Sequence, residues 1–185
     1  MKKIEFNEEN LKQCEIDRTV NKVRGLIFNK KGEVLLCNYA GVYLLPGGSI
    51  EQGETITQAF LREAKEETGI DLDYTKAVPF LEMKSFNKNY YDRKLKKDIN
   101  RLTQTTFFEA KTDTNIAIEK RELTQSEKEK GFYAKFVDIQ SIPTLLKENK
   151  SDNPKLNTFN KELITVLEQY SKWKQEQTKT EPKTK

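Results

Sequence analysis

Three acidic side chains recur at helical spacing within the segment 55–69, and they point to metal chemistry. An apolar stripe begins at Ile56 and Phe60, and on a 3.6-residue repeat its next turns carry carboxylates where apolar side chains would be expected. Spacings of three and four residues place these carboxylates on one face, and they belong to Glu63, Glu66 and Glu67. Like charges at the edge of a core repel one another and lose solvation unless a cation compensates for them. Carboxylate oxygens are the ligands that Mg²⁺ prefers, so the pattern indicates a divalent-cation site.

The neighbours of these glutamates are suited to holding them in place. Arg62 precedes Glu66 by one helical turn and can pair with an adjacent carboxylate, which would fix its orientation. Gly47 and Gly48 have no Cβ, so they let the backbone approach a metal ion and phosphate groups closely. Taken alone, however, the cluster 62–67 favours an amphipathic surface helix rich in Glu and Lys.

The spacing of this cluster to the residues before it changes that interpretation. The segment Gly48–Ile70 resembles the signature of the Nudix hydrolase family (MutT-like), G-x5-E-x7-R-E-U-x-E-E-x-G-U, in which U is a bulky aliphatic residue. Every fixed position of the signature is filled, by Gly48, Glu54, Arg62, Glu63, Glu66, Glu67 and Gly69. Ala64 is small for the first U position. A chance match at all fixed positions has a probability of roughly 10⁻⁸ per start position, which favours the family over the surface helix.

The resemblance implies a fold and a metal site. The fold is the Nudix α/β/α sandwich, an α/β architecture with a mixed β-sheet between helices, here with an extra C-terminal helix. The cofactor is Mg²⁺ or Mn²⁺, and the positions that match the family's metal ligands are Glu63, Glu66, Glu67 and the carbonyl of Gly47. Glu54 and Arg62 match positions that orient those carboxylates by hydrogen bonds and ion pairing.

The implied reaction is attack of a metal-activated water on one phosphorus of a diphosphate bridge. The substrate is expected to be a nucleoside diphosphate linked to another moiety, as in a nucleoside triphosphate, a nucleotide sugar or a dinucleotide. The general base stays open between Glu66, Glu67 and a downstream acidic residue. For the last of these the candidates are Glu122, Glu127 and Glu129, of which we favour Glu127. Two alternatives are an RNA 5′-end pyrophosphohydrolase and a non-catalytic Nudix-fold sensor that binds a nucleotide.

The sequence indicates the substrate-binding residues less clearly than it indicates the metal ligands. Arg24 is a candidate to grip a phosphate, and the candidates to stack on a base are Tyr39, Tyr43 and Phe80. Aromatic residues in strands are more typical of core packing. The basic stretch 88–101 is a candidate contact for phosphates or RNA, although an exposed connection kept soluble by charge is the more usual role. The net charge of +4 does not favour RNA.

Periodicity and turn residues predict the elements that position the signature. The predicted strands are 20–28, 33–39, 77–86, 102–110 and 132–139. We expect an exposed loop at 87–100. Thr55, with Gln58 three residues on, predicts a capped helix that ends at Gly69. Ser141 is expected to cap a short helix, and Asn153 a longer one.

Composition narrows the chemistry further. The 185-residue chain contains no histidine and two cysteines, so a metal must be held by oxygen and neither triad chemistry nor a thiolate zinc site is available. No apolar stretch approaches the roughly 20 residues that span a bilayer, and we expect a cytoplasmic protein, with a homodimer as a candidate assembly. The expected organisation is an N-terminal segment at 1–17, a Nudix domain at 18–150, a helix packed on it at 151–175 and a disordered tail at 176–185.

Overall fold

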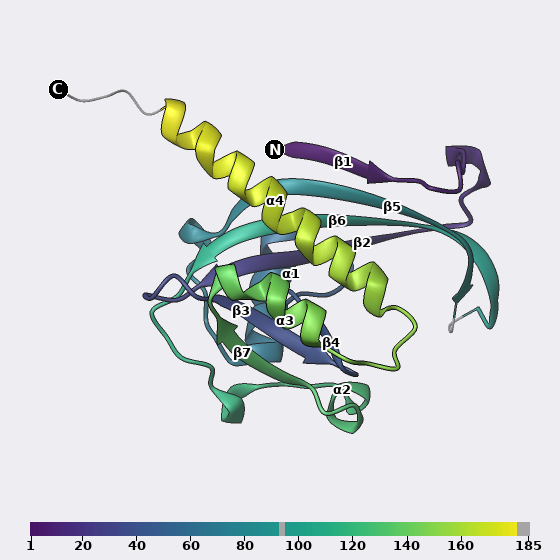
Figure 1. Ribbon diagram of the computed structural model, residues 1–185. Helices are drawn as coiled ribbons and strands as arrows, with labels where there is room; N and C mark the ends of the chain where they lie inside the picture. The colour runs from purple at the N-terminus through teal and green to yellow at the C-terminus, as the bar shows by residue number, and fades with distance from the viewer. Residues whose placement is uncertain (93–94, 181–185) are drawn as a thin grey trace.

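The chain folds as an α/β/α sandwich, which confirms the predicted fold class. The computed structural model describes residues 1–92 and 95–180. A seven-stranded mixed sheet lies between helix α1 (Ile56–Thr68) and the pair α3 (Ile142–Glu148) and α4 (Leu156–Thr180) (Figure 1). A further short helix, α2 (Gln125–Glu129), precedes the last strand. Among the described residues, no helix combines the length and the apolar character needed to cross a membrane.

The sheet has the order β1-β5-β6-β2-β3-β4, and β7 pairs with β3. Its strands are β1 (Lys2–Phe6), β2 (Arg18–Phe28), β3 (Val34–Tyr39), β4 (Val42–Leu44), β5 (Val78–Asp92), β6 (Lys97–Lys111) and β7 (Tyr133–Val137). The pairs β1/β5 and β2/β6 are parallel, and the other pairs are antiparallel. Strand β2 therefore lies near the centre of the sheet, beside the loop that leads into α1.

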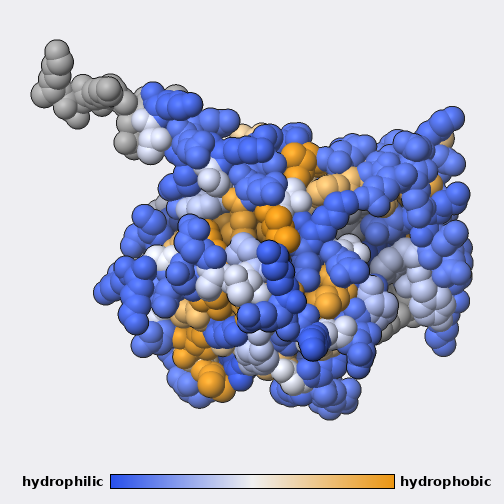
Figure 2. All heavy atoms as spheres, in the orientation of Figure 1, coloured by the Kyte–Doolittle hydropathy of each residue, from blue (hydrophilic) through white to orange (hydrophobic). Residues whose placement is uncertain are grey.

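Each face of the sheet has its own core. On the α1 side, Phe60 is fully buried and stacks on Phe108 with ring centroids 4.7 Å apart. On the α3/α4 side, Phe80 is 1% exposed and packs against Tyr170 and Trp173 of α4. Phe80 is thus part of this core and is not available to stack on a base. Outside these cores the surface in Figure 2 is largely hydrophilic, with apolar side chains in small groups beside α4 and near β7.

Helix α1 has the boundaries that its sequence predicts. The hydroxyl of Thr55 accepts a hydrogen bond from the Gln58 backbone N–H, and the Gln58 side chain accepts one from the Thr55 N–H, which completes a capping box. Gly69 ends the helix with φ of 71°, the left-handed conformation that glycine adopts without strain. A Cβ at Gly69 would also lie 2.1 Å from the carbonyl oxygen of Ala117, so no larger residue fits.

The prediction of a loop at 87–100 is wrong over most of the described residues, because β5 continues to Asp92 and β6 begins at Lys97. Asn87 pairs with Arg101 and Tyr90 with Ile99 beyond a register shift, and the paired strands extend past the body of the sheet (Figure 1). Polar side chains on both faces hide the alternation that marks a half-buried strand. Arg93 and Lys94, which we had included in the basic stretch, lie outside the described residues.

The N-terminal segment, whose structure was not predicted, forms a strand, and the two C-terminal helices differ from expectation. The N-terminal segment contains β1, which pairs with β5. At the short helix α3, Ser141 stands at the N-cap but its hydroxyl donates to the Asp138 carbonyl and caps nothing. Helix α4 begins at Leu156 and continues past 175 to Thr180, because Gln, Lys and Glu propagate a helix well. Residues 181–185 of the predicted tail lie outside the described part of the chain.

Candidate active site

Arg62 is the hub of the carboxylate cluster on α1. Its Nε and Nη2 donate to the two carboxylate oxygens of Glu54 at 2.7 and 3.0 Å, a bidentate pair. Its Nη1 donates to Glu63 at 3.1 Å and to Glu66 at 3.0 Å, and Nη2 reaches the Ser49 carbonyl at 3.0 Å. The hydrogen bond from Arg62 lowers the pKa of Glu54. One guanidinium therefore orients three carboxylates and ties the loop before the helix to the helix itself.

Glu67 lies deeper than its neighbours, at 8% exposure. Its Oε2 accepts a hydrogen bond from the Gly47 N–H at 2.8 Å, and the buried Cys37 thiol lies 3.8 Å from the same oxygen. Burial raises the pKa of Glu67 to about 8, against the opposing effect of the Gly47 hydrogen bond. Burial also raises the pKa of Glu63. Both carboxyls are thus destabilised as anions until a cation compensates for them.

Two glycines form the wall against which these carboxylates rest. Gly47 has φ of 139°, and a Cβ there would lie 2.1 Å from the Val23 carbonyl oxygen. A Cβ on Gly48 would instead lie 2.3 Å from Glu63 Oε1 and 2.5 Å from Oε2. At position 47 the backbone conformation and the neighbouring Val23 carbonyl exclude any residue with a Cβ. At position 48 the missing Cβ leaves room for the Glu63 carboxylate.

The donor set fits a hard divalent cation. Carboxylate oxygens of Glu63 and Glu67 lie against the same Gly47–Gly48 backbone, and Glu66 shares an Arg62 nitrogen with Glu63. Within residues 1–92 and 95–180, no three Cys, His, Asp or Glu side chains converge as a ready-made metal cluster. The carboxylates are turned toward Arg62 and Gly47, so rotation of their side chains is needed to bring them onto one ion.

The downstream acidic residue that we favoured lies near this cluster. The negative charge of Glu127 contributes to the raised pKa values of Glu63 and Glu67. Its Oε2 accepts hydrogen bonds from the Thr124 backbone N–H at 2.6 Å and the Thr124 hydroxyl at 2.7 Å, the capping box of α2. Nearby, the backbone N–H of Glu122 donates to the Glu66 carbonyl at 2.8 Å, which ties this loop to α1.

Two of the candidate substrate contacts, Arg24 and Tyr39, are engaged in contacts within the fold. Arg24 is 7% exposed, donates to the Leu45 carbonyl at 2.8 Å and pairs with Glu162 of α4 at 3.5 Å. The Tyr39 hydroxyl lies 2.9 Å from that of Ser126 and so joins β3 to α2. Arg24 holds the strand before Gly47 against α4, and Tyr39 holds the segment that carries Glu127.

Sequence reasoning missed Lys22, which lies beside the glycine wall. Lys22 forms an antiparallel bridge with Ser49, and the adjacent Val23 N–H donates to the Gly48 carbonyl at 2.9 Å. Its burial and the positive charges of Arg24 and Arg101 lower the pKa of Lys22 to about 8. The available signal was strand alternation, which puts residue 22 on the same side of β2 as residue 24.

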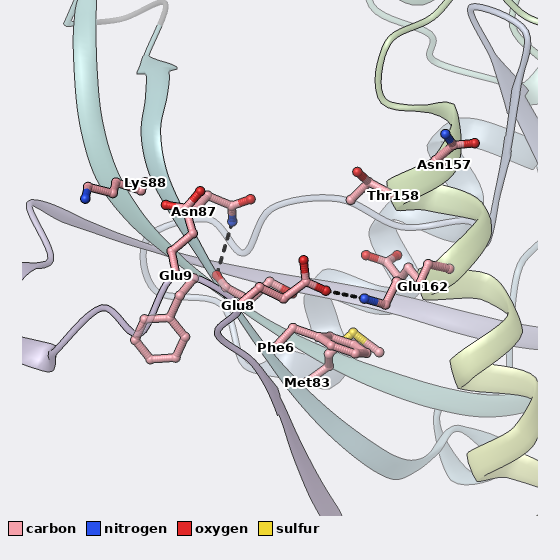
Figure 3. A pocket seen from close by; sticks show the side chains of 12 residues that line it. Phe6, Glu8, Glu9, Met83, Asn87, Lys88, Asn157, Thr158 and Glu162 are labelled. Carbon is pink, nitrogen blue, oxygen red and sulfur yellow. Dashed lines mark hydrogen bonds and ion pairs between the residues drawn. The ribbon is translucent and has the colours of Figure 1, made fainter.

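A cavity of about 350 Å³ adjoins this region between the sheet and the first turns of α4. Figure 3 shows Phe6 and Met83 facing the α4 side chains Asn157, Thr158 and Glu162. An ion pair between Glu8 and Lys161 crosses its rim. Glu162, which lines the cavity, also pairs with Arg24, and the positive charge of Arg24 acts on Glu67 of the carboxylate cluster. It has the size and polarity to take a small molecule.

Comparison with known proteins agrees with the fold and the signature. The sequence model of the family described as NUDIX domain matches residues 18–159, which is most of the chain. The protein therefore belongs to the Nudix family. The chain is 33% identical over 84 residues to the NAD-capped RNA hydrolase NudC of Vibrio atlanticus (strain LGP32), covering 42% of this chain and 31% of that protein.

Two further comparisons agree. The chain is 43% identical over 49 residues to the ADP-ribose pyrophosphatase of Methanocaldococcus jannaschii, covering 24% of this chain and 29% of that protein. The chain thus spans less than a third of the length of either curated relative. The NUDIX domain of Shewanella oneidensis NrtR, solved in complex with ADP-ribose, aligns with a TM-score of 0.53 at 16% identity. That alignment covers 88% of this chain and 93% of the NrtR domain, and it shows a shared fold.

Proposed function

We propose that this protein is a divalent-cation-dependent hydrolase that cleaves a diphosphate bond in a nucleoside diphosphate linked to another moiety. The observation that carries the proposal is the Arg62-centred cluster, in which Glu54, Glu63 and Glu66 share one guanidinium beside the buried Glu67. Burying a carboxyl whose pKa is thereby raised to about 8 is unfavourable in a helix that serves only as a surface element. In a phosphate-binding metal centre the bound cation offsets the desolvation of that carboxylate.

The proposed division of labour follows the contacts. Glu63, Glu66, Glu67 and the Gly47 carbonyl hold Mg²⁺ or Mn²⁺, while Glu54 and Arg62 position them. When bound, the cation supplies acidity to a water molecule and neutralises charge on the phosphoryl oxygens. Glu67 holds a proton near neutral pH while no cation is bound, so cation binding displaces that proton.

The general base is one of Glu66, Glu67 and Glu127. Glu127 can take this role only after it releases its capping bonds to Thr124, because its Oε2 is engaged there. Glu66 is the more exposed of the two helix candidates, with 35% of its side chain accessible. Water therefore reaches Glu66 without any rearrangement of α2.

The moiety beyond the diphosphate is proposed to occupy the 350 Å³ cavity that is lined by Glu162, the partner of Arg24. Relatives that act on NAD-capped RNA and on ADP-ribose support a nucleotide-linked diphosphate as the substrate class. Capped or triphosphorylated RNA 5′ ends are the alternative within that class.

The test is release of phosphate, pyrophosphate or a nucleoside monophosphate from a substrate panel. The panel contains nucleoside triphosphates, nucleotide sugars, ADP-ribose, dinucleotides and 5′-triphosphorylated RNA, each with Mg²⁺ or Mn²⁺ at alkaline pH. We expect turnover of at least one class that a chelator abolishes. Binding of a nucleotide with no turnover across the panel would contradict the proposal and identify a sensor.

A further inference from the structure

Three polar side chains line one face of the sheet between the glycine wall and the outer part of the β5–β6 pair. In the parallel register of β2 and β6, Val20 pairs with Thr103 and Arg18 with Arg101. Strand alternation therefore puts Arg101 and Thr103 on the same side as Lys22. This is also the side on which Leu26 and Phe107 enter the core beneath α4. We call Lys22, Arg101 and Thr103 the Lys22 cluster.

The members of the Lys22 cluster have unmet hydrogen-bonding capacity. In the described part of the chain, the Lys22 ammonium has no carboxylate within ion-pair distance, and the negative charges of Glu162 and Glu63 act on it from further away. Arg101 Nε and the Thr103 hydroxyl are both buried without a hydrogen-bond partner among the described residues. Buried polar groups in folded proteins nearly always have a hydrogen-bond partner. The unpaired Arg101 Nε and Thr103 hydroxyl therefore indicate that a ligand binds beside them.

The charges and hydrogen-bond donors of the Lys22 cluster favour a negatively charged ligand. Two of its three members are cations, all three can donate a hydrogen bond, and Arg24 adds a further positive charge that acts on Lys22. Arg101 is held in place by stacking, since its Cζ lies 3.3 Å from the centroid of the Tyr90 ring. Like charges that burial brings together repel one another, and an oxyanion between them would relieve that repulsion.

The position of the cluster places that anion beside the metal site. Lys22 bridges Ser49, the residue after the glycine against which Glu63 rests. Arg101 begins about 13 Å further along the strands, at roughly 3.3 Å per residue. Its guanidinium stacks on Tyr90, which pairs with Ile99, and its positive charge acts on Lys22. A phosphate chain that starts at the metal site and runs along this face would meet Lys22 first.

We propose that the Lys22 cluster is a subsite for a phosphate group of the substrate that lies beyond the diphosphate bound at the carboxylates. The assignment of that phosphate to the substrate rests on the function proposed above. The anion site itself rests only on the contacts of Lys22, Arg101 and Thr103. Substrates that carry a third phosphate group are therefore preferred over those whose distal group is neutral.

The test uses inorganic pyrophosphate as the probe and the whole protein freed of metal ions. Binding is measured by titration calorimetry for the wild type and for Lys22→Met, Arg101→Met and Thr103→Val. Lys84→Met is the matched control, because Lys84 pairs with Gln104 on the opposite side of the same sheet. Without metal, the carboxylates repel the probe, so the titration reports on cationic groups.

We expect pyrophosphate to bind the wild type and Lys84→Met equally, and at least tenfold more weakly to Lys22→Met, which corresponds to about 1.4 kcal/mol. Arg101→Met is expected to show a similar loss, and the nearly isosteric Thr103→Val a smaller one. No binding to the wild type, or equal binding to Lys22→Met, would overturn the proposal.

Thermal unfolding without ligand separates a binding role from a structural one. Lys22→Met removes a desolvated charge that has no partner, so its melting temperature should equal or exceed that of the wild type. A clear fall in melting temperature would show that Lys22 stabilises the fold, and would overturn the proposal. Failure of the proposed function is distinguishable, because an inactive protein would still bind pyrophosphate through Lys22.

Discussion

Replacing Gly48 with alanine would place a methyl group 2.3 Å from Glu63 Oε1 and 2.5 Å from Oε2. Ordinary contact begins at 3.4 Å, so the carboxylate must retreat by about 1 Å. The atoms that move are the end of a flexible side chain, and Gly48 does not have a positive φ, so the backbone accepts alanine. We expect the melting temperature to stay within about 4 °C of the wild type, since the cost is below about 1 kcal/mol.

Activity should respond much more strongly than stability. A misplacement of about 1 Å in a catalytic constellation costs on the order of 10²-fold in rate. We therefore expect Gly48→Ala to lower metal-dependent turnover by about 10- to 100-fold and to weaken Mn²⁺ binding. The assay is the initial rate on the best substrate of the panel, measured over a range of Mn²⁺ concentrations.

Gly47→Ala provides the contrast for this experiment. Its methyl group would lie 2.1 Å from the Val23 carbonyl oxygen and 2.7 Å from the Arg24 Cα, and its φ of 139° is unfavourable for alanine. Because backbone atoms cannot retreat as a side chain does, this variant should lose stability together with activity. A Gly48→Ala protein with the rate and metal affinity of the wild type would refute the reasoning that Glu63 is a metal ligand.

Three further predictions concern pH and packing. The carboxyl of Glu67, with its pKa raised from 4.5 to about 8, keeps a proton in the folded state that the unfolded chain loses above pH 4.5. The metal-free protein should therefore lose stability as pH rises from 4.5 to 8, and Glu67→Gln should flatten that fall in thermal denaturation. Gly25→Ala would put a methyl group 2.3 Å from the buried Phe60 ring, and should cost about 1–3 kcal/mol in urea unfolding. Tyr170→Phe removes a 2.9 Å hydrogen bond to the buried Glu109 and should cost about 1–3 kcal/mol in the same assay, whereas an unchanged midpoint would show that Lys174 alone satisfies Glu109.

The sequence predicts the helix of the signature well because its determinants are local. Thr55, Gln58 and Gly69 act within a few residues of one another, and the structure shows the same cap and the same left-handed end. The contact of Arg62 with Glu66 follows from helical spacing in the same way, whereas the role of Glu54 was expected from the family resemblance. Such features depend on neighbours in the chain, so pattern reasoning reaches them.

Features that depend on distant partners were not predictable. In the sequence Arg24 is a candidate phosphate ligand. In the fold it forms an ion pair with Glu162, which lies far along the chain and could not be predicted as its partner. Lys22 carries no motif, and its isolation emerges only when β2, β6 and α4 are packed together. The strand pairing of 87–92 with 97–101 was missed because it involves cross-strand contacts such as Arg101 on Tyr90, which have no periodic signature.

The most direct test of the proposed metal site is the metal-dependent rate of Glu67→Gln beside that of Glu119→Gln. Both changes neutralise one glutamate, but Glu67 is buried at the proposed metal site and Glu119 is exposed. We expect a wild-type rate for Glu119→Gln. For Glu67→Gln we expect a larger loss of rate than the factor of about 10 to 100 that follows removal of an outer-shell partner of a metal. Full activity of a folded Glu67→Gln protein would contradict the metal site on which the proposed function depends.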